Sequence, residues 1–99
     1  MGIIARKTLR QFWDQSKHAD AEQPLRAWFR EAAHADWKSP ADVKADYRSA
    51  SIVANDRVVF NIADNKYRLV VRINYAYRVV YIRFVGTHRQ YDRINVKEI

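Results

Sequence analysis

Four side chains suited to acid–base or phosphate chemistry follow one glycine near the end of the sequence. They are His88, Arg89, Tyr91 and Asp92, after Gly86. A histidine titrates near neutral pH, a tyrosine can donate a proton, and an arginine can hold a phosphate. Together they could cleave RNA without a metal, through attack of the RNA's own 2′-hydroxyl on the adjacent phosphorus. The same spacing also fits an exposed loop histidine and a tyrosine packed into the core.

The composition indicates one small basic domain that spans residues 1–99. Of its 99 residues, 48% are hydrophobic and 13% aromatic, which supplies one modest core. The formal net charge of +7 favours a polyanion or an acidic protein as partner. Residues 51 to 99 carry nine basic and four acidic groups and hold most of that excess. We therefore expect the C-terminal half to face the polyanion.

Several classes of site and location are excluded by what the sequence lacks. It has no cysteine, so disulfides and cysteine ligands are excluded, which is consistent with a reducing cytoplasm. No apolar run approaches the ~18 residues of a membrane helix. The only glycines are Gly2 and Gly86, so a glycine-rich phosphate loop is absent, and the three histidines are too scattered for a metal motif. We expect a cytoplasmic protein with no metal, no cofactor and no membrane contact.

Helical spacing of apolar residues dominates the first half of the chain. Two amphipathic helices are predicted by the residues Leu9, Phe12, Trp13, Leu25, Trp28, Phe29 and Ala32. Asp20 is a candidate N-cap for the second helix, although Pro24 also allows a start at Gln23. Ser39 before Pro40 predicts a short third helix that ends at about Tyr47. Basic residues on the first helix form either a phosphate-binding rim or a solvated face: Arg6, Lys7 and Arg10.

From Ser51 onward the hydrophobic period changes to two, and β-branched and aromatic residues alternate with turn signals. The pattern predicts an antiparallel meander with strands at about 51–54, 57–62, 67–73 and 79–85. Helices followed by such a meander predict an α+β fold, with the helices packed on a twisted antiparallel sheet. We expect Gly86 to let the chain turn after the last strand, so that His88 lies near the edge of the sheet.

Alternate side chains of these strands point to opposite faces of the sheet. The face toward the helices would carry Val58, Phe60, Ile62, Leu69, Val71, Ile73, Val80, Ile82 and Phe84. The opposite face would carry Val59, Asn61, Arg68, Val70, Arg72, Val79, Tyr81 and Arg83. Three arginines and a tyrosine on one surface suit phosphate pairing and base stacking, because a guanidinium matches phosphate oxygens and an aromatic ring accepts a base. A simply solvated face fits the same pattern.

Several motifs give the chain a resemblance to a known family. They are Val58-Val59-Phe60-Asn61-Ile62, Asn65-Lys66-Tyr67-Arg68-Leu69-Val70, Tyr81-Ile82-Arg83, and Gly86-Thr87-His88 with Tyr91-Asp92. In these motifs the sequence resembles the HigB family of type II toxins, within the RelE superfamily, and the similarity covers nearly the whole chain. The resemblance implies a microbial-ribonuclease-like fold and an endoribonuclease that cleaves messenger RNA on the translating 70S ribosome. It also implies a HigA-type antitoxin with a helix-turn-helix region, which brings the complex to operator DNA.

The resemblance also assigns roles to individual residues. Arg68 would contact the scissile phosphate, and His88 and Tyr91 would occupy the C-terminal catalytic segment. His88 is either a general acid or base, or a charged stabiliser of the phosphorane. RelE relies on lysines on the strand matched by residues 58–62, where this chain offers Asn61 and no lysine, so the general base stays open.

The wider set of RNA contacts expected from the sheet face and its turns is Asn61, Lys66, Arg72, Tyr81, Arg83 and Arg89. Lys66 would reach phosphate from a hairpin turn, or it only solubilises that turn. A non-catalytic RNA- or DNA-binding module would use the same basic face, and so would a degenerate toxin that now acts mainly in a protein complex. Only the active toxin predicts cut RNA.

Overall fold

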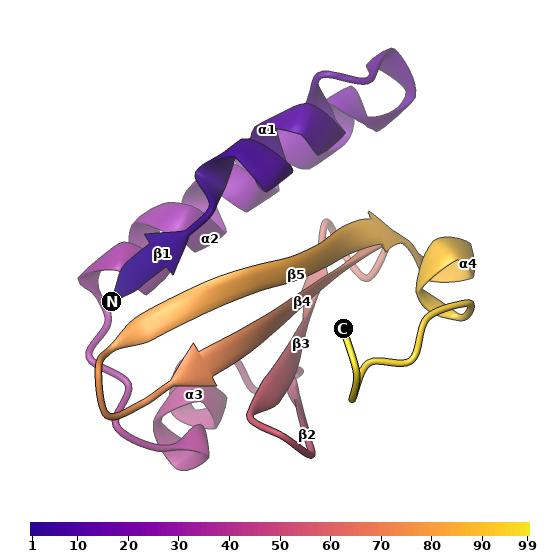
Figure 1. Ribbon diagram of the computed structural model, residues 1–99. Helices are drawn as coiled ribbons and strands as arrows, with labels where there is room; N and C mark the ends of the chain where they lie inside the picture. Colours follow the sequence, from indigo (N-terminus) through magenta and orange to yellow (C-terminus); the bar gives the residue numbers. More distant parts are fainter.

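The computed structural model describes residues 1–99 and shows one five-stranded sheet with helices packed on it (Figure 1). The strands are β1 (Gly2–Ile4), β2 (Ser51–Val53), β3 (Arg57–Ile62), β4 (Tyr67–Asn74) and β5 (Val79–Thr87). Their order in the sheet is β1-β5-β4-β3-β2. Strands β2 to β5 form the predicted antiparallel meander, whereas β1 pairs with β5 in parallel. The α+β class and the four predicted strands are thereby confirmed, and β1 is an addition.

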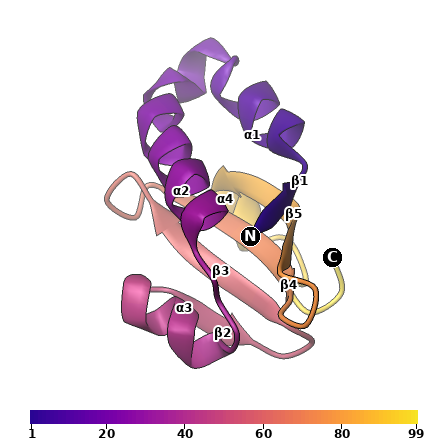
Figure 2. The same cartoon turned by 90° about the vertical axis from the view of Figure 1, so that its left-hand side faces the viewer.

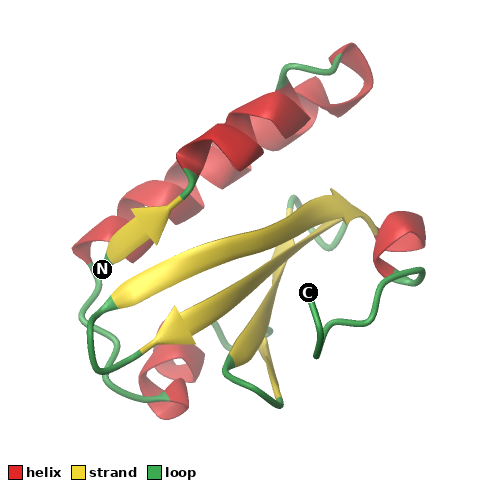
Figure 3. Ribbon diagram, viewed as in Figure 1, coloured by secondary structure: helices red, strands yellow, loops and turns green.

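The helices are α1 (Arg6–Trp13), α2 (Glu22–His34), α3 (Pro40–Asp46) and α4 (His88–Tyr91), and a 3₁₀ segment, η1 (Ser16–Ala21), joins the first two (Figure 3). In Figure 2, α2 and α3 lie on one side of the sheet, and the segment that follows α4 lies on the other. No helix has the length and apolar character needed to cross a membrane.

The start of α2 differs from the prediction. Its N-cap position is Ala21, and no side chain caps the helix there. The assignment of Asp20 as N-cap was therefore wrong, because its carboxylate is engaged by Lys66 and Tyr67 instead. The alternative start at Gln23 is one residue too late. The third helix begins with Pro40 in its first turn and ends where expected.

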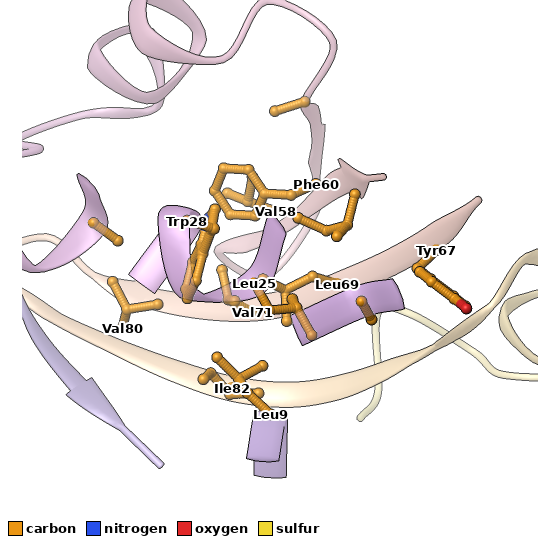
Figure 4. Close-up of a cluster of buried hydrophobic side chains, with 14 of the residues drawn as sticks. Leu9, Leu25, Trp28, Val58, Phe60, Tyr67, Leu69, Val71, Val80 and Ile82 are labelled. Carbon is orange, nitrogen blue, oxygen red and sulfur yellow. The ribbon is translucent and has the colours of Figure 1, made fainter. Parts of the chain in front are cut away.

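The core fills the space between the sheet and the helix pair α1–α2, and Figure 4 shows its centre. The ring of Trp28 meets Phe60 edge-on, with the centroids 5.4 Å apart. Aliphatic side chains from α1, α2, β3, β4 and β5 surround this pair, and each buried one stabilises the fold by about 1.5–3 kcal/mol. The tryptophans at positions 13, 28 and 37 are all buried in this core.

A β-bulge changes the facing of β5. Val70 pairs with Phe84 and Val71 pairs with Ile82, so Arg83 is an extra residue on β5. A bulge shifts the alternation of side chains by one position. Phe84 therefore shares the face of Val70, and the prediction that it faces the helices was wrong. Val85 packs against the core in its place.

Candidate active site

The sheet face turned away from α1 and α2 carries three cross-strand rows from β3, β4 and β5. The register gives them as Asn61–Arg68–Gly86, Val59–Val70–Phe84 and Arg57–Arg72–Tyr81. Basic groups occupy the two outer rows, and the middle row is apolar. The outer rows lie four residues apart along β3 and β4, which is about 13 Å, and five residues apart along β5, where the bulge adds one. The three predicted arginines share this face, but they form two clusters and not one.

The chain after α4 returns across this face of the sheet (Figure 1). Arg57 donates to the main-chain oxygen of Ile99 through Nε at 3.1 Å and Nη2 at 2.5 Å. Asn55 Nδ2 donates to the oxygen of Lys97 at 3.3 Å. Val59 and Val70 are only 3% and 0% exposed although they lie outside the helix-side core. We infer that the returning segment covers the middle row and separates the two basic clusters.

Arg68 lies in the first row, in the middle of the sheet. Its Nη1 donates to the main-chain oxygen of Asn65 at 2.7 Å, which draws the guanidinium toward the β3–β4 turn. The same nitrogen makes a longer contact of 3.4 Å to the main-chain oxygen of Tyr67, and Nε and Nη2 have no partner in the chain. Beside it, Asn61 Nδ2 donates to the oxygen of Ser49 at 3.1 Å. Because a guanidinium has five N–H donors, most of the Arg68 fork stays available for a phosphate.

Gly86 lies within β5 and not in a turn, so the expectation of a turn there was wrong. No glycine of the chain has a positive φ. Its role is close approach, because a Cβ there would lie 2.5 Å from Phe84 Cζ and 2.7 Å from Gln90 Oε1. The chain turns at Thr87, which forms a capping box with Gln90. The Phe84 ring and α4 can therefore both pack closely on β5.

The short helix α4 carries the predicted catalytic side chains and packs against the ends of β4 and β5. The rings of His88 and Tyr91 are 6.4 Å apart between centroids. His88 Nε2 lies 3.6 Å from Asp92 Oδ2, which is an ion-pair distance when the imidazole is protonated and too long for a good hydrogen bond. The side chain of His88 is 58% exposed, so a substrate can reach it. Arg89 is also exposed on this helix.

The second basic cluster lies at the opposite end of the same face. Arg83 Cζ stands 5.6 Å from the centre of the Tyr81 ring, a cation–π distance, and Arg72 lies directly opposite Tyr81 across the sheet. The side chains of Arg72 and Arg83 are exposed and make no hydrogen bond or ion pair within the chain. Two unneutralised guanidinium groups beside an aromatic ring can hold phosphates and stack a base.

Lys66 has a different environment from the one expected for an RNA contact. Its Nζ lies 2.5 Å from Asp20 Oδ2, and the Tyr67 hydroxyl donates to Asp20 Oδ1 at 2.5 Å. These two hydrogen bonds, that of Lys66 first, lower the pKa of the Asp20 carboxyl, and Asp20 in turn raises the pKa of Lys66. Asp20 was missed as a partner of this turn, because 46 residues separate it from Lys66 and no local pattern links them.

The site is an open surface and not an enclosed cavity. Nowhere in the chain do three or more His, Asp or Glu side chains gather as a group that could hold a metal ion. The structure brings together Asn61, Arg68, His88 and Tyr91 at one end of the face. It places Arg72, Tyr81 and Arg83 at the other end.

Comparison with known proteins adds a family assignment to this geometry. A search of curated proteins gives no match. The family model HigB_toxin, described as the RelE-like toxic component of a toxin-antitoxin system, matches residues 21–94. This range includes β2 to β5 and α4, and therefore every candidate site residue. The chain belongs to the HigB toxin family, the RelE-like toxic components of toxin–antitoxin systems.

Proposed function

We propose that this toxin is an endoribonuclease that cleaves messenger RNA on the translating ribosome by metal-independent chemistry. One observation carries the proposal: the row that contains Arg68 ends at Gly86, and two residues later α4 begins with His88. A phosphate-binding guanidinium and a titratable imidazole therefore lie at the same end of one surface. Membership of a family of mRNA-cleaving toxins supports the same activity.

The proposed reaction is transesterification within the RNA. The 2′-oxygen attacks the adjacent phosphorus, the bond from phosphorus to the 5′-oxygen breaks, and the products are a 2′,3′-cyclic phosphate and a 5′-hydroxyl. One proton leaves the 2′-hydroxyl and one reaches the 5′-oxygen. Arg68 holds the non-bridging oxygens, on which negative charge grows in the transition state. His88 transfers a proton, and Tyr91 orients the RNA or the acid.

The openness of the site supports dependence on the ribosome. In an open surface the RNA is not held on all sides, so the 2′-oxygen, the phosphorus and the leaving oxygen are not aligned by the protein alone. Strand β3 offers Asn61 and no lysine at the edge of the site. A ribosome that holds the messenger in a bent conformation would supply the missing alignment.

The second cluster extends the proposed RNA contacts. Arg72 and Tyr81 lie about 13 Å from the Arg68 row along the strands, and the bulge residue Arg83 lies between them and that row. Stacked nucleotides advance by about 3.4 Å each, so this distance corresponds to about four of them. Between the clusters the RNA would pass over the C-terminal segment that covers the middle row, and Arg89 would contact the RNA from α4.

A cognate antitoxin follows from membership of a toxin–antitoxin family. We propose that it is of the HigA type, with a helix-turn-helix region through which the complex binds operator DNA. The net charge of +7 supports an acidic antitoxin segment as the part that contacts the toxin.

The deciding experiment incubates the purified toxin with programmed ribosomes and maps the 5′ ends of the messenger. We expect new 5′-hydroxyl ends within the codon at the ribosomal site. A messenger with 2′-deoxynucleotides at the cut position is the matched control, because it lacks the attacking group and should stay intact. A non-catalytic RNA-binding module on the same face would bind the messenger without cutting it. Absence of cleavage with and without ribosomes would overturn the enzymatic proposal.

A further inference from the structure

Asp20 joins the helix pair to the turn that precedes Arg68. Its two carboxylate oxygens accept from different neighbours, Oδ2 from Lys66 Nζ and Oδ1 from the Tyr67 hydroxyl, each at 2.5 Å. These neighbours are the two residues immediately before Arg68 in the sequence. The α1–η1 end of the helix pair therefore holds the start of β4 through one carboxylate.

The position of Tyr67 is fixed from the other side as well. Its side chain is 0% exposed, and Figure 4 shows it at the end of the core with its oxygen directed away from the cluster. The ring lies edge-on to Phe12 at 5.1 Å and to His18 at 5.6 Å between centroids. His18 in turn stacks on Phe12 at 4.2 Å. Tyr67 is thus anchored by the core, and its hydroxyl meets the half-exposed Asp20 side chain at the rim of the core.

The turn between β3 and β4 needs such an anchor. Ala63, Asp64 and Asn65 have φ angles of 55°, 52° and 72°, in the left-handed region that residues with a Cβ disfavour. Inside the turn, the amide of Lys66 donates to the oxygen of Ala63 at 3.1 Å. A run of three left-handed residues persists only where the surrounding structure holds it.

The β3–β4 turn also holds the guanidinium of Arg68. Arg68 Nη1 donates to the oxygen of Asn65, the third left-handed residue, at 2.7 Å. If the turn relaxes, this oxygen moves and the guanidinium loses its fixed direction. The contacts therefore run from Asp20 to Lys66 and Tyr67, then to the turn, and then to Arg68.

We propose that Asp20 is a positioning residue that fixes the Arg68 guanidinium through the β3–β4 turn. The inference rests on the proposed function, since it assigns Arg68 to the scissile phosphate. Asp20 does not touch the RNA, and the family match begins one residue after it.

Replacement of Asp20 by asparagine tests the proposal with little change of shape. The amide still accepts from Tyr67, but it cannot neutralise Lys66. Under saturating ribosomes we expect the cleavage rate constant to fall about tenfold, because a small displacement of a catalytic group is costly. Affinity for an uncleavable 2′-deoxy messenger should change less than about twofold, since Arg72 and Arg83 still bind the backbone. Asp20→Glu, which keeps the charge, should recover part of the rate.

Asp36→Asn is the matched control. Asp36 also pairs with a basic side chain, accepting from Arg78 Nε at 2.7 Å, but it lies at the far end of the helices from the turn. The Asp36→Asn variant should leave both the cleavage rate constant and the affinity for the 2′-deoxy messenger unchanged. Lys66→Gln breaks the same ion pair without altering η1, so it should lower the rate constant even if Asp20→Asn folds poorly. Wild-type cleavage by Asp20→Asn and Lys66→Gln would overturn the proposal.

A second measurement separates this proposal from the proposed function. Amide exchange of residues 63–66 and the Nε–H resonance of Arg68, both read by NMR on the free protein, report the turn without any RNA. We expect faster exchange and a shifted Arg68 resonance in Asp20→Asn but not in Asp36→Asn. If the wild type cuts no RNA, the proposed function fails, and these spectra still decide the positioning. Unchanged spectra would overturn it.

Discussion

Arg68 on β4 lies directly opposite Gly86 on β5, and the space where a side chain at position 86 would stand is occupied by the Phe84 ring and the Gln90 amide. Gln90 belongs to α4, the helix that carries His88 and Tyr91. A single cross-strand pair therefore connects the strand proposed to bind phosphate with the helix proposed to transfer protons. Changes at either residue should affect the chemical step, for different physical reasons.

Removal of the Arg68 guanidinium should abolish most of the activity. We expect Arg68→Ala to lower the ribosome-dependent cleavage rate about 100- to 1000-fold, the usual cost of losing one preorganised donor of the transition state. Arg68→Lys should recover only part of this loss, because an ammonium is a point charge and cannot bind two phosphate oxygens as a fork. Single-turnover rates at saturating ribosomes measure both effects. A wild-type rate in Arg68→Ala would remove this residue from the site.

A side chain at position 86 should destabilise the fold and displace α4. In Gly86→Ala the new Cβ would overlap Phe84 and Gln90, and relief of such overpacking costs about 1–3 kcal/mol. Urea unfolding of the variant measures the loss in the free energy of unfolding.

Gly2→Ala is the matched control for this change. A Cβ on Gly2 has only the Arg78 oxygen near it, at 3.8 Å, which is ordinary contact. That variant should unfold at the wild-type urea concentration. If the two variants are equally stable, the side chains of Phe84 and Gln90 can move away from the new Cβ without loss in the free energy of unfolding.

The same region shows what the sequence could and could not reveal. Alternation of apolar residues located β3 and β4 correctly, because both strands are regular and one face of each is buried. The same alternation gave the wrong face for Phe84. The bulge depends on how β5 pairs with β4, and the sequence of β5 alone does not show it. Strand β1 was missed because its three residues are too few to show a period. The glycine was recognised as important, but for a turn and not for close approach.

Contacts between distant parts of the chain were equally invisible in the sequence. Asp20 looked like a helix cap because the capping preference is local, whereas its partners lie on β4 and in the preceding turn. The C-terminal residue Ile99 returns to Arg57, a contact between positions 42 residues apart that only the fold brings about. The basic face was predicted as one surface, and not as two clusters, because the return of the C-terminal segment cannot be read from the sequence.

Acid should weaken the fold through Asp20 and Asp36. The pKa of each carboxyl is lowered below the usual 3.8, Asp20 by the Lys66 bond first and Asp36 by the Arg78 bond first. A depressed pKa in the folded state means that the contribution to stability is present above the unfolded value. It is lost as the pH falls through the lower folded value.

Urea unfolding between pH 6 and pH 2 checks this expectation. We compare the free energy of unfolding of the wild type with that of the double variant Asp20→Asn/Asp36→Asn. The difference between the two should be constant from pH 6 down to about pH 4 and should become smaller at lower pH. A difference that stays constant down to the lowest pH would contradict the assigned direction of the shifts.

The second basic cluster should affect RNA affinity more than the chemical step. Arg72→Gln and Arg83→Gln should each weaken binding of an uncleavable messenger and reduce the salt slope of log K by about 0.7, the value for one phosphate contact with a single strand. The cleavage rate constant at saturation should stay near the wild type, because neither residue reaches the Arg68 row.

Arg78→Gln is a suitable control for these two variants. Arg78 is also an arginine of the sheet region, but its guanidinium is committed to Asp36 and to the main-chain oxygen of Tyr75. It should leave the salt slope unchanged. If all three variants shift the slope equally, the effect reflects net charge and not a local contact.

The pH dependence of cleavage should decide what His88 does. A histidine that transfers a proton makes the rate depend on pH between about 5.5 and 8. A general base must be neutral, so the rate would rise with pH and reach a plateau. A general acid, or a charged stabiliser of the phosphorane, must be protonated, so the rate would fall as pH rises. His88→Gln should remove the inflection and lower the rate, while Arg89→Gln on the same helix should keep the inflection. A wild-type rate that is flat across this range would exclude titration of His88 from the reaction, and proton transfer would then have to come from Tyr91 or from the ribosome.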